Sequence, residues 1–356
     1  NILRSHANVD HTDEINSIYA LIPIIVHCYR RDCKLPHDEV LKIVKWFYYS
    51  QVRRRYVSQL PQKLDYDLKI VKESKSPFDR LLEVIREERG GNISILPEEF
   101  EGRAIQHPLF ALLKWHLKSR GAICLTTGVK IQKPMGEKYQ LEYDHIFPYS
   151  KLKGKGYGMG NRLKYALAQE LTNRAILTQL GNRTKGAKDA DGYLAGVQER
   201  FSTALGLQLI PEDKELWDID NYELFLKTRR KMLAESLNTW LDGIVENSSI
   251  AEEVSLEDLI AEGENEDLEL KETLRWDVRE NKVNKDLENV IMKTVAAFSN
   301  AQGGTLIIGV KDKGEIVGLE NDFKSLGGGD KDKFELHLTN LMNKFFLSVR
   351  LWRTHF

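Results

Sequence analysis

Cysteine is scarce in this chain, with three residues among 356. Cys28, Cys33 and Cys124 provide no paired framework, which argues against a fold held by several disulfides and favours reduced thiols in a cytoplasmic protein. Cys28 and Cys33, with His27 and His37 nearby, could suggest zinc. Structural zinc sites usually show two tight pairs of ligands, so partly buried thiols are the simpler interpretation.

Long apolar runs are also lacking. No segment approaches the roughly 20 apolar residues that a membrane-spanning helix needs. The longest run near the start, residues 18–26, is interrupted by Pro23. The chain shows no signal peptide, so no membrane partner is expected. It begins with Asn1 rather than Met, and we therefore expect it to start inside a longer protein.

A strong charge of one sign is absent, because the formal net charge is −1. The chain as a whole is therefore not a basic nucleic-acid binder, although its charges are unevenly distributed. Hydrophobic residues make up 42% and charged residues 29%, as in ordinary globular proteins. The length suggests two or three domains. The patterns below predict an α+β protein.

Residues 1–125 are expected to form a helical bundle. Apolar positions recur at helical spacing from Asp13 to Ile25 and from Asp38 to Tyr49. Ser76-Pro77 is a helix-start signal, and Pro108 begins a helix that ends near Gly121.

Basic residues form a short run within this bundle, Arg53-Arg54-Arg55. Such a run is either a phosphate-facing patch or, more often, a solvated helix face.

Residues 126–245 are expected to form a second domain with a basic segment. Nine Lys and Arg residues lie between Lys151 and Lys188, against the lone acid Glu170. Four glycines at every second position from Gly154 predict a mobile loop there. A basic, flexible segment suits a polyanionic substrate.

Residues 246–267 are expected to be an extended acidic linker, since eight Asp and Glu residues between 252 and 267 meet no Lys or Arg. Residues 268–356 are expected to form a small α/β domain. A strand is predicted at 268–271, a helix at 286–301 and a buried strand at 305–310, with a hairpin partner at 315–319. The last residues, 351–356, lack the pattern of a domain end and suggest truncation.

The most informative stretch is Tyr143-Asp144-His145-Ile146-Phe147-Pro148. Phosphodiester hydrolysis needs an activated water and neutralisation of negative charge, and a neutral His with a divalent metal can supply both. Mg²⁺ or Mn²⁺ needs few protein ligands, so the Asp144 carboxylate and the Asn182 amide oxygen could hold it. Asn173 could orient the imidazole of His145. Strict strand geometry places Asp144 and His145 on opposite faces.

These residues resemble the HNH, or ββα-metal, nucleases. The resemblance implies that His145 is the general base, that Asp144 and Asn182 are metal ligands, and that Asn173 precedes the second strand. The segment from His107 to Tyr193 looks like the C-terminal nuclease domain of GmrSD-type, modification-dependent restriction enzymes, although these often carry His-His where this chain has Asp-His. In that family a ParB-like nucleotide-using domain normally precedes this part, and its motif is absent here.

The basic residues near this motif are candidates for contact with nucleic-acid phosphates. They are Lys151, Lys153, Lys155, Arg174, Arg183, Lys185 and Lys188.

The C-terminal segment resembles the Schlafen/AlbA-like domain through Leu268-Glu269-Leu270-Lys271-Glu272 and Gly303-Gly304-Thr305-Leu306-Ile307-Ile308-Gly309-Val310. That family is described as a DNA- or ATP-binding module, and some members are RNases. The resemblance implies an acidic triad of Glu264, Glu269 and Asp312. Nucleic-acid binding without this triad is the other interpretation. Gly327-Gly328-Gly329 lacks the Lys-Ser/Thr of a P-loop, so it is expected to be a flexible turn.

Together these patterns favour a cytoplasmic metal-dependent DNA endonuclease of restriction or antiphage type, acting on DNA that includes modified phage DNA. Two alternatives are a DNA-binding or regulatory protein with a degenerate HNH fold and an RNase acting through the C-terminal domain.

Overall fold

The computed structural model describes residues 2–131, 140–246, 256–265, 268–300, 304–328 and 330–352. Within these residues the chain is mainly helical with small sheets, so the expected α+β class is confirmed. The chain divides into two compact units, residues 1–250 and 251–356, and each is described by itself.

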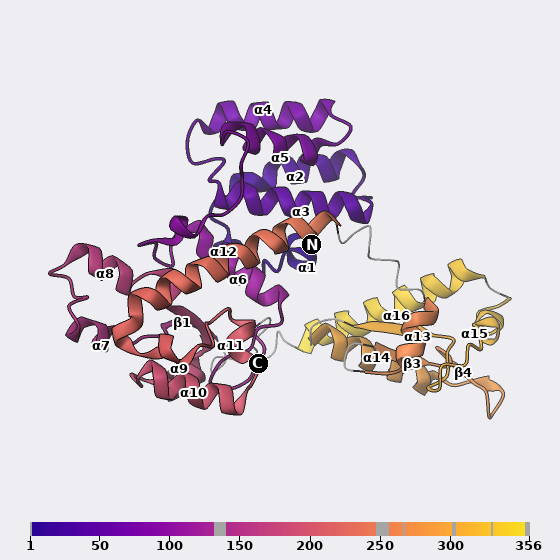
Figure 1. Ribbon diagram of the computed structural model, residues 1–356. Helices are drawn as coiled ribbons and strands as arrows, with labels where there is room; N and C mark the ends of the chain where they lie inside the picture. The colour runs from indigo at the N-terminus through magenta and orange to yellow at the C-terminus, as the bar shows by residue number, and fades with distance from the viewer. Residues whose placement is uncertain are drawn as a thin grey trace. The chain divides into compact units, whose positions relative to one another are not determined.

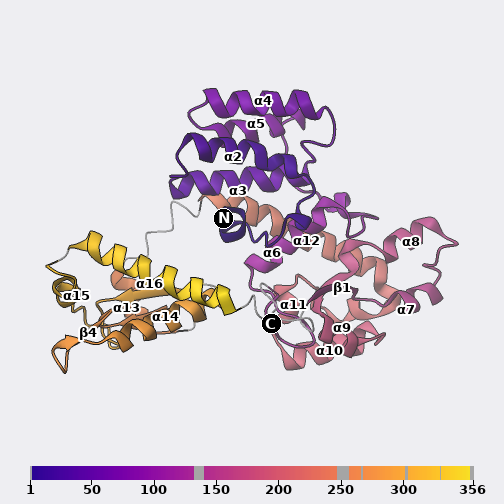
Figure 2. The same ribbon diagram turned by 180° about the vertical axis from the view of Figure 1, so that it is seen from behind.

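A helical bundle opens the first unit, as expected. Its helices α2 and α3 pack with α4 and α5 (Figures 1 and 2). The elements are α1 (Ile2–His6), η1 (Thr12–Glu14), η2 (Ile18–Ala20), α2 (Leu21–Arg30), α3 (His37–Val52), α4 (Leu60–Glu73), α5 (Pro77–Glu88) and η3 (Pro97–Phe100). The helix expected from Asp13 begins only at Leu21, because Pro23 has no backbone N–H and is tolerated in the first turn of a helix.

Two long helices link the bundle to the rest of the first unit. These are α6 (Pro108–Ser119) and α12 (Tyr222–Glu246). The ring of Trp240 on α12 lies 4.8 Å from that of Tyr48 and 4.7 Å from that of His116. Residues from both expected domains therefore share one hydrophobic core, and the first 250 residues form one compact unit.

In the arginine run of residues 53–55, Arg54 is exposed, whereas Arg53 and Arg55 are used inside the bundle. The guanidinium of Arg55 is buried and donates two hydrogen bonds to Asp67 and one to Glu88. Arg53 donates to Glu99 and to the carbonyls of residues 93 and 94. Both expectations are therefore wrong for Arg53 and Arg55, because these two side chains join elements of the bundle.

A two-stranded antiparallel hairpin follows, and a short helix comes directly after it. The strands are β1 (Leu141–His145) and β2 (Arg174–Thr178), paired from Leu141↔Thr178 to His145↔Arg174, and the helix is α9 (Gln179–Lys185). The Thr178 hydroxyl accepts the backbone N–H of Gly181 at 3.1 Å and thereby caps α9.

The glycine-containing segment between the strands folds into two short helices, α7 (Tyr149–Gly154) and α8 (Arg162–Ala168). Leu152 and Tyr157 are buried in the core and anchor this segment, while Gly154, Gly156 and Gly160 are exposed. The remaining elements of this unit are η5 (Leu171–Asn173), α10 (Ala190–Arg200), α11 (Ala204–Leu207), η6 (Lys214–Trp217) and η7 (Ile219–Asn221).

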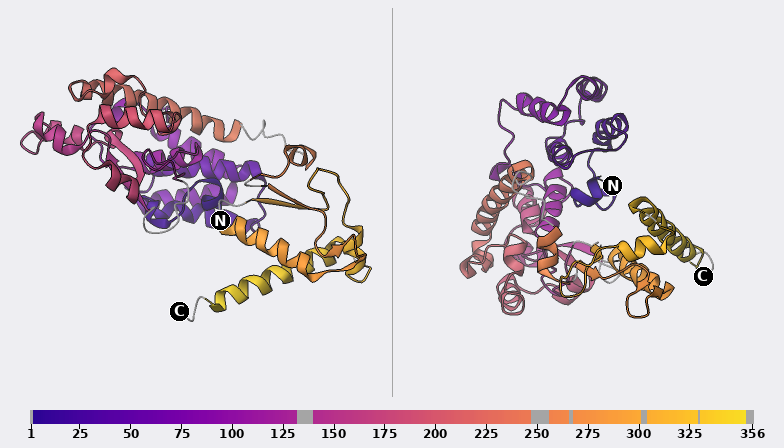
Figure 3. Two further views of the ribbon diagram at one scale, coloured as in Figure 1. Left: turned by 90° about the horizontal axis from the view of Figure 1, so that it is seen from below. Right: turned by 90° about the vertical axis from the view of Figure 1, so that its right-hand side faces the viewer.

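The second unit contains the expected strands and helix. Its elements are α13 (Leu256–Glu262), β3 (Leu268–Lys271), β4 (Trp276–Asp277), β5 (Lys282–Val283), α14 (Lys285–Asn300), β6 (Thr305–Ile308), α15 (Glu320–Ser325) and α16 (Lys331–Trp352). β3 and β6 pair in parallel, and α14 packs against α16 (Figure 3). The expected hairpin partner at 315–319 forms one isolated bridge, Val310↔Ile316.

Part of the expected linker is a helix. α13 lies within residues 246–267, and its Ile260 packs in the same hydrophobic cluster as Leu268 and Leu270. The expectation of an extended linker is wrong for α13, because one apolar side chain anchors it to the sheet. Residues 247–255 and 266–267 lie outside the described part of the chain.

The three consecutive glycines follow α15. Gly327 and Gly328 have φ values of 81° and 70°, a conformation that favours glycine, as a turn requires. Gly329 and the end of the expected tail, residues 353–356, lie outside the described residues. Among the described helices, no stretch has both the length and the apolar character to cross a membrane.

Candidate active site

The candidate site is built on the β1–β2 hairpin and α9. Because side chains alternate along a strand, Glu142 and Asp144 share one face of β1, and contacts from α9 show that this face meets the helix. Asn182 donates its amide N–H to Glu142 Oε2 at 2.6 Å, and Lys185 Nζ donates to Asp144 Oδ2 at 2.5 Å. Two of the expected residues, Asp144 and Asn182, therefore lie on facing surfaces of adjacent elements.

His145 makes its ring contacts with a different set of residues. Its Nδ1 lies 3.1 Å from Arg174 Nη1, and its Nε2 lies 3.3 Å from Gln169 Oε1. Guanidinium can only donate and an amide oxygen can only accept, so this network assigns the proton to Nε2 and leaves Nδ1 as the acceptor. Both ring nitrogens are therefore engaged.

Burial, together with the positive charge of Arg174, lowers the pKa of His145 to about 4. The imidazole is consequently neutral at pH 7, the form that can accept a proton. Arg174 is itself half-buried, and desolvation lowers the pKa of its guanidinium.

Asn173 does not hold the imidazole of His145. Its buried amide accepts the backbone N–H of Phe147 at 2.9 Å and donates to the carbonyls of Phe147 and Ala168. The expected orienting role is wrong, because this side chain instead ties the end of β1 to the segment before β2. Gln169 and Arg174 contact the ring in its place.

Of the seven expected phosphate-contacting residues, Arg174 bonds to His145 and Gln169, and the other six form three groups. Lys185 is buried, with 1% of its side chain exposed, so direct contact with a phosphate is excluded in this conformation. Lys151 and Lys155 are exposed but paired with Asp189 and Asp220. The exposed cations without such a pair in the described residues are Lys153, Arg183 and Lys188.

The donor chemistry around α9 fits a hard divalent cation. Asp144 Oδ1, Glu142 Oε1 and Asn182 Oδ1 take part in no hydrogen bond or ion pair among the described residues. Oxygen ligands of this kind are the ones Mg²⁺ and Mn²⁺ prefer. Within the described residues, no group of three or more His, Cys, Asp or Glu side chains could hold a metal. The candidate ligands are therefore two carboxylates, Glu142 and Asp144, and one amide, Asn182.

Sequence reasoning missed Glu142 and Gln169. The alternation of β1 could have identified Glu142, because it lies two residues before Asp144. Gln169 gave no signal, since its approach to His145 depends on how the segment between the two strands folds.

Cys28 and Cys33 show no zinc-site geometry. His27 is buried and bonds to Glu39 at 2.7 Å, while Cys33 is exposed.

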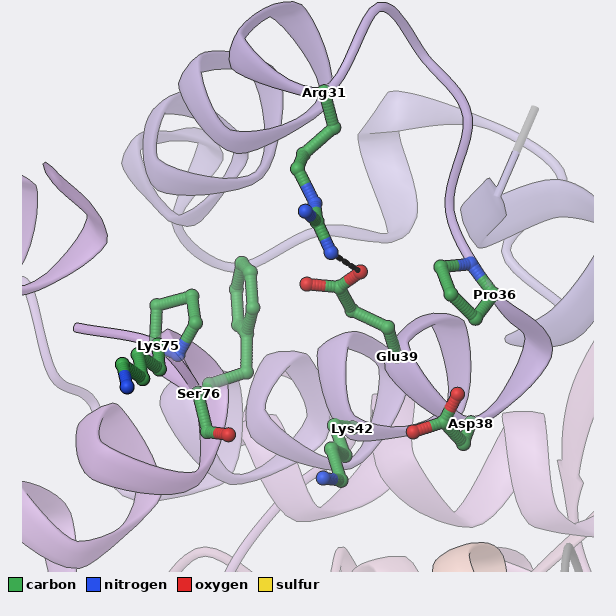
Figure 4. A pocket seen from close by; sticks show the side chains of 9 residues that line it. Arg31, Pro36, Asp38, Glu39, Lys42, Lys75 and Ser76 are labelled. Carbon is green, nitrogen blue, oxygen red and sulfur yellow. Dashed lines mark hydrogen bonds and ion pairs between the residues drawn. The ribbon is translucent and has the colours of Figure 1, made fainter.

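A small cavity of about 150 Å³ lies near this region. Figure 4 shows Arg31 paired with Glu39 at its wall, and Lys42 pairs with Asp79. Since these charges are used within the bundle, the cavity offers little to a charged ligand.

The second unit carries the other expected acidic site. Lys271 Nζ lies 2.6 Å from Glu269 Oε1 and 3.4 Å from Glu264 Oε1, so two of the three expected acids converge on one lysine. Asp312 is exposed and forms no hydrogen bond or ion pair with any other described residue. The structure therefore brings together Glu264 and Glu269 without Asp312.

Comparison with known protein families supports the resemblance of this unit. Residues 264–348 match the family described as Schlafen, AlbA_2. The C-terminal unit is Schlafen/AlbA-like. The family is linked to nucleic-acid binding or nuclease activity. The match begins at Glu264, inside the expected linker, which agrees with the packing of this region on β3. Among curated proteins, none matches the chain.

Proposed function

We propose that the chain is a metal-dependent DNA endonuclease of the HNH type, with a role in restriction or antiphage defence. The observation that carries the proposal is a hairpin followed directly by a helix, with Asp144 and His145 on the first strand and Asn182 on the helix. Glu142, Asp144 and Asn182 offer oxygen ligands where β1 meets α9, and the imidazole of His145 on the same strand is neutral at pH 7.

Asp144 and Asn182, with Glu142 beside them, would hold Mg²⁺ or Mn²⁺. When bound, the metal would neutralise negative charge on the scissile phosphate and on the leaving oxygen. His145 serves as the general base in its neutral form. Its Nδ1 first has to be released from Arg174, and a phosphate that attracts this guanidinium would release it.

Exposed cations supply contacts to the DNA backbone. Lys153, Arg183 and Lys188 are suited to phosphates because they are not already neutralised by a neighbouring carboxylate. The Schlafen/AlbA-like unit adds a second surface for nucleic acid.

The experiment is cleavage of supercoiled plasmid with Mg²⁺, Mn²⁺ or EDTA. We expect metal-dependent nicking or linearisation that falls about 100-fold or more in His145→Ala, since removal of a general base has this order of effect. His11→Ala is the matched control, because this histidine is exposed in the first unit. Equal nicking by His145→Ala would contradict the proposal. Binding of DNA without cleavage in either metal would favour the non-cleaving alternative.

An RNase activity of the Schlafen/AlbA-like unit is the second candidate. It is favoured by the convergence of Glu264 and Glu269 on Lys271. It predicts cleavage of RNA that survives His145→Ala and is lost in Glu269→Gln.

A further inference from the structure

Lys185 occupies an unusual place in the candidate site. Its ammonium lies 2.5 Å from Asp144 Oδ2, 2.6 Å from the carbonyl oxygen of His145 and 5.4 Å from the centre of the Tyr193 ring. The side chain is 1% exposed. A buried lysine is costly unless it is paired, so Asp144 holds it in place and is itself held.

Arg174 is a second positively charged side chain close to Asp144. Arg174 donates to the carbonyl of Tyr143, to His145 and to Gln169, which are all uncharged acceptors. Its buried Nε has no hydrogen-bond partner among the described residues. The guanidinium therefore has bonding capacity left for an anion, and phosphate is an anion that guanidinium binds well.

The two cations offset the two carboxylates, Glu142 and Asp144, before any metal arrives. A divalent cation added alone would place a large positive charge in a partly buried site beside a fixed ammonium, which repels it. A phosphodiester bound at Arg174 would reduce that positive charge. Metal and phosphate should consequently favour each other's binding.

Resting on the proposed function, we propose that Lys185 is a fixed counter-cation of the site and makes divalent-metal binding depend on a bound phosphodiester. Lys185 is a positioning residue, since it acts through Asp144 and does not contact the substrate. Its role is to keep the free protein poorly loaded with metal until DNA is present.

The test is titration of the full chain with Mn²⁺, followed by electron paramagnetic resonance of the free ion, with and without a short DNA duplex. The DNA arm uses a His145→Ala background to prevent cleavage. We expect the duplex to tighten Mn²⁺ binding about tenfold or more. We expect Lys185→Met to tighten Mn²⁺ binding by a similar factor without DNA, because the stem is kept and the charge is removed.

Two controls separate charge from structure. Lys185→Arg keeps the charge and should bind Mn²⁺ as weakly as the parent chain, and Lys214→Met removes an exposed lysine of η6 and should change nothing. Urea unfolding of each variant verifies that it folds. If Lys185→Met does not fold, Lys185→Arg and the titration with DNA still test the inference.

The outcomes distinguish the inference from the proposed function. Tight Mn²⁺ binding by the free parent chain, unaffected by DNA or by Lys185→Met, would overturn the inference and leave the nuclease standing. Absence of Mn²⁺ binding in every variant, with and without DNA, would overturn both.

Discussion

Asn173 and Asn182 differ in what surrounds them, and their substitutions should differ accordingly. Asn173→Ala removes three buried hydrogen bonds to the backbone of Phe147 and Ala168. Because it leaves buried groups unsatisfied, we expect a loss of about 2–3 kcal/mol in the free energy of unfolding, measured in urea.

Asn182→Ala serves as the matched comparison. This side chain is half-buried and makes one side-chain hydrogen bond, so we expect a loss below about 1 kcal/mol together with weaker Mn²⁺ binding in the presence of DNA. A larger loss of stability from Asn182→Ala than from Asn173→Ala would contradict this division of roles.

His116 on α6 should make the stability of the first unit depend on pH. Burial lowers its pKa to about 3 from 6.5, so the folded state disfavours protonation while the unfolded chain accepts a proton. The contribution of neutral His116 is complete above pH 6.5 and is lost as the pH falls toward 3. The free energy of unfolding should drop by at most about 1.4 kcal/mol per pH unit.

Urea unfolding at pH 7.5 and pH 5 measures this effect. His116→Gln removes the titrating group at this position and should show a smaller drop between the two values. If both proteins lose the same stability, another group is responsible.

At the scale of elements, Arg229 ties α12 to the segments around β2 and α11. This arginine is fully buried and donates to the carbonyls of Thr172, Arg174, Gln208 and Leu209. Arg229→Met should lower the free energy of unfolding by about 3 kcal/mol or more, because four carbonyls lose their donor. Lys227→Met, at an exposed position of the same helix, should change it by less than about 0.5 kcal/mol in the same urea assay. Similar losses in the two variants would show that the hydrogen bonds of Arg229 do not hold α12 to these segments.

Local patterns predicted the helices and strands better than their contacts. Pro108 and Gly121 bracket α6, and alternation identified β3, because these signals depend on neighbouring residues. The hydrogen bond from Phe147 to Asn173 spans 26 positions, and the one from Lys185 to Asp144 spans 41. No local pattern carries that information, so the type of residue at the candidate site was predictable while its partners were not.

For the molecule as a whole, the division into two compact units predicts two unfolding transitions. Ile260 on α13 belongs to the core of the second unit and is 8% exposed. Ile260→Ala should therefore lower the stability of that unit by about 2–4 kcal/mol and leave the other transition unchanged. Near-UV circular dichroism in urea can follow both.

Ile316→Ala is the control for that experiment. Its side chain is 59% exposed in the same unit, and the substitution should leave both midpoints in place. Coupled shifts of the two transitions in Ile260→Ala would mean that the units unfold as one.

The position of α12 at the end of the first unit also affects how the chain matures during synthesis. The bundle, the hairpin and α9 all precede Tyr222, yet much of the hydrophobic surface they share is covered by α12. At about 5–20 residues per second, the ribosome would take roughly 6–24 seconds to complete that helix after the bundle has been synthesised. During this interval the nascent chain would expose apolar surface, so we expect it to depend on holding chaperones until translation has passed Glu246.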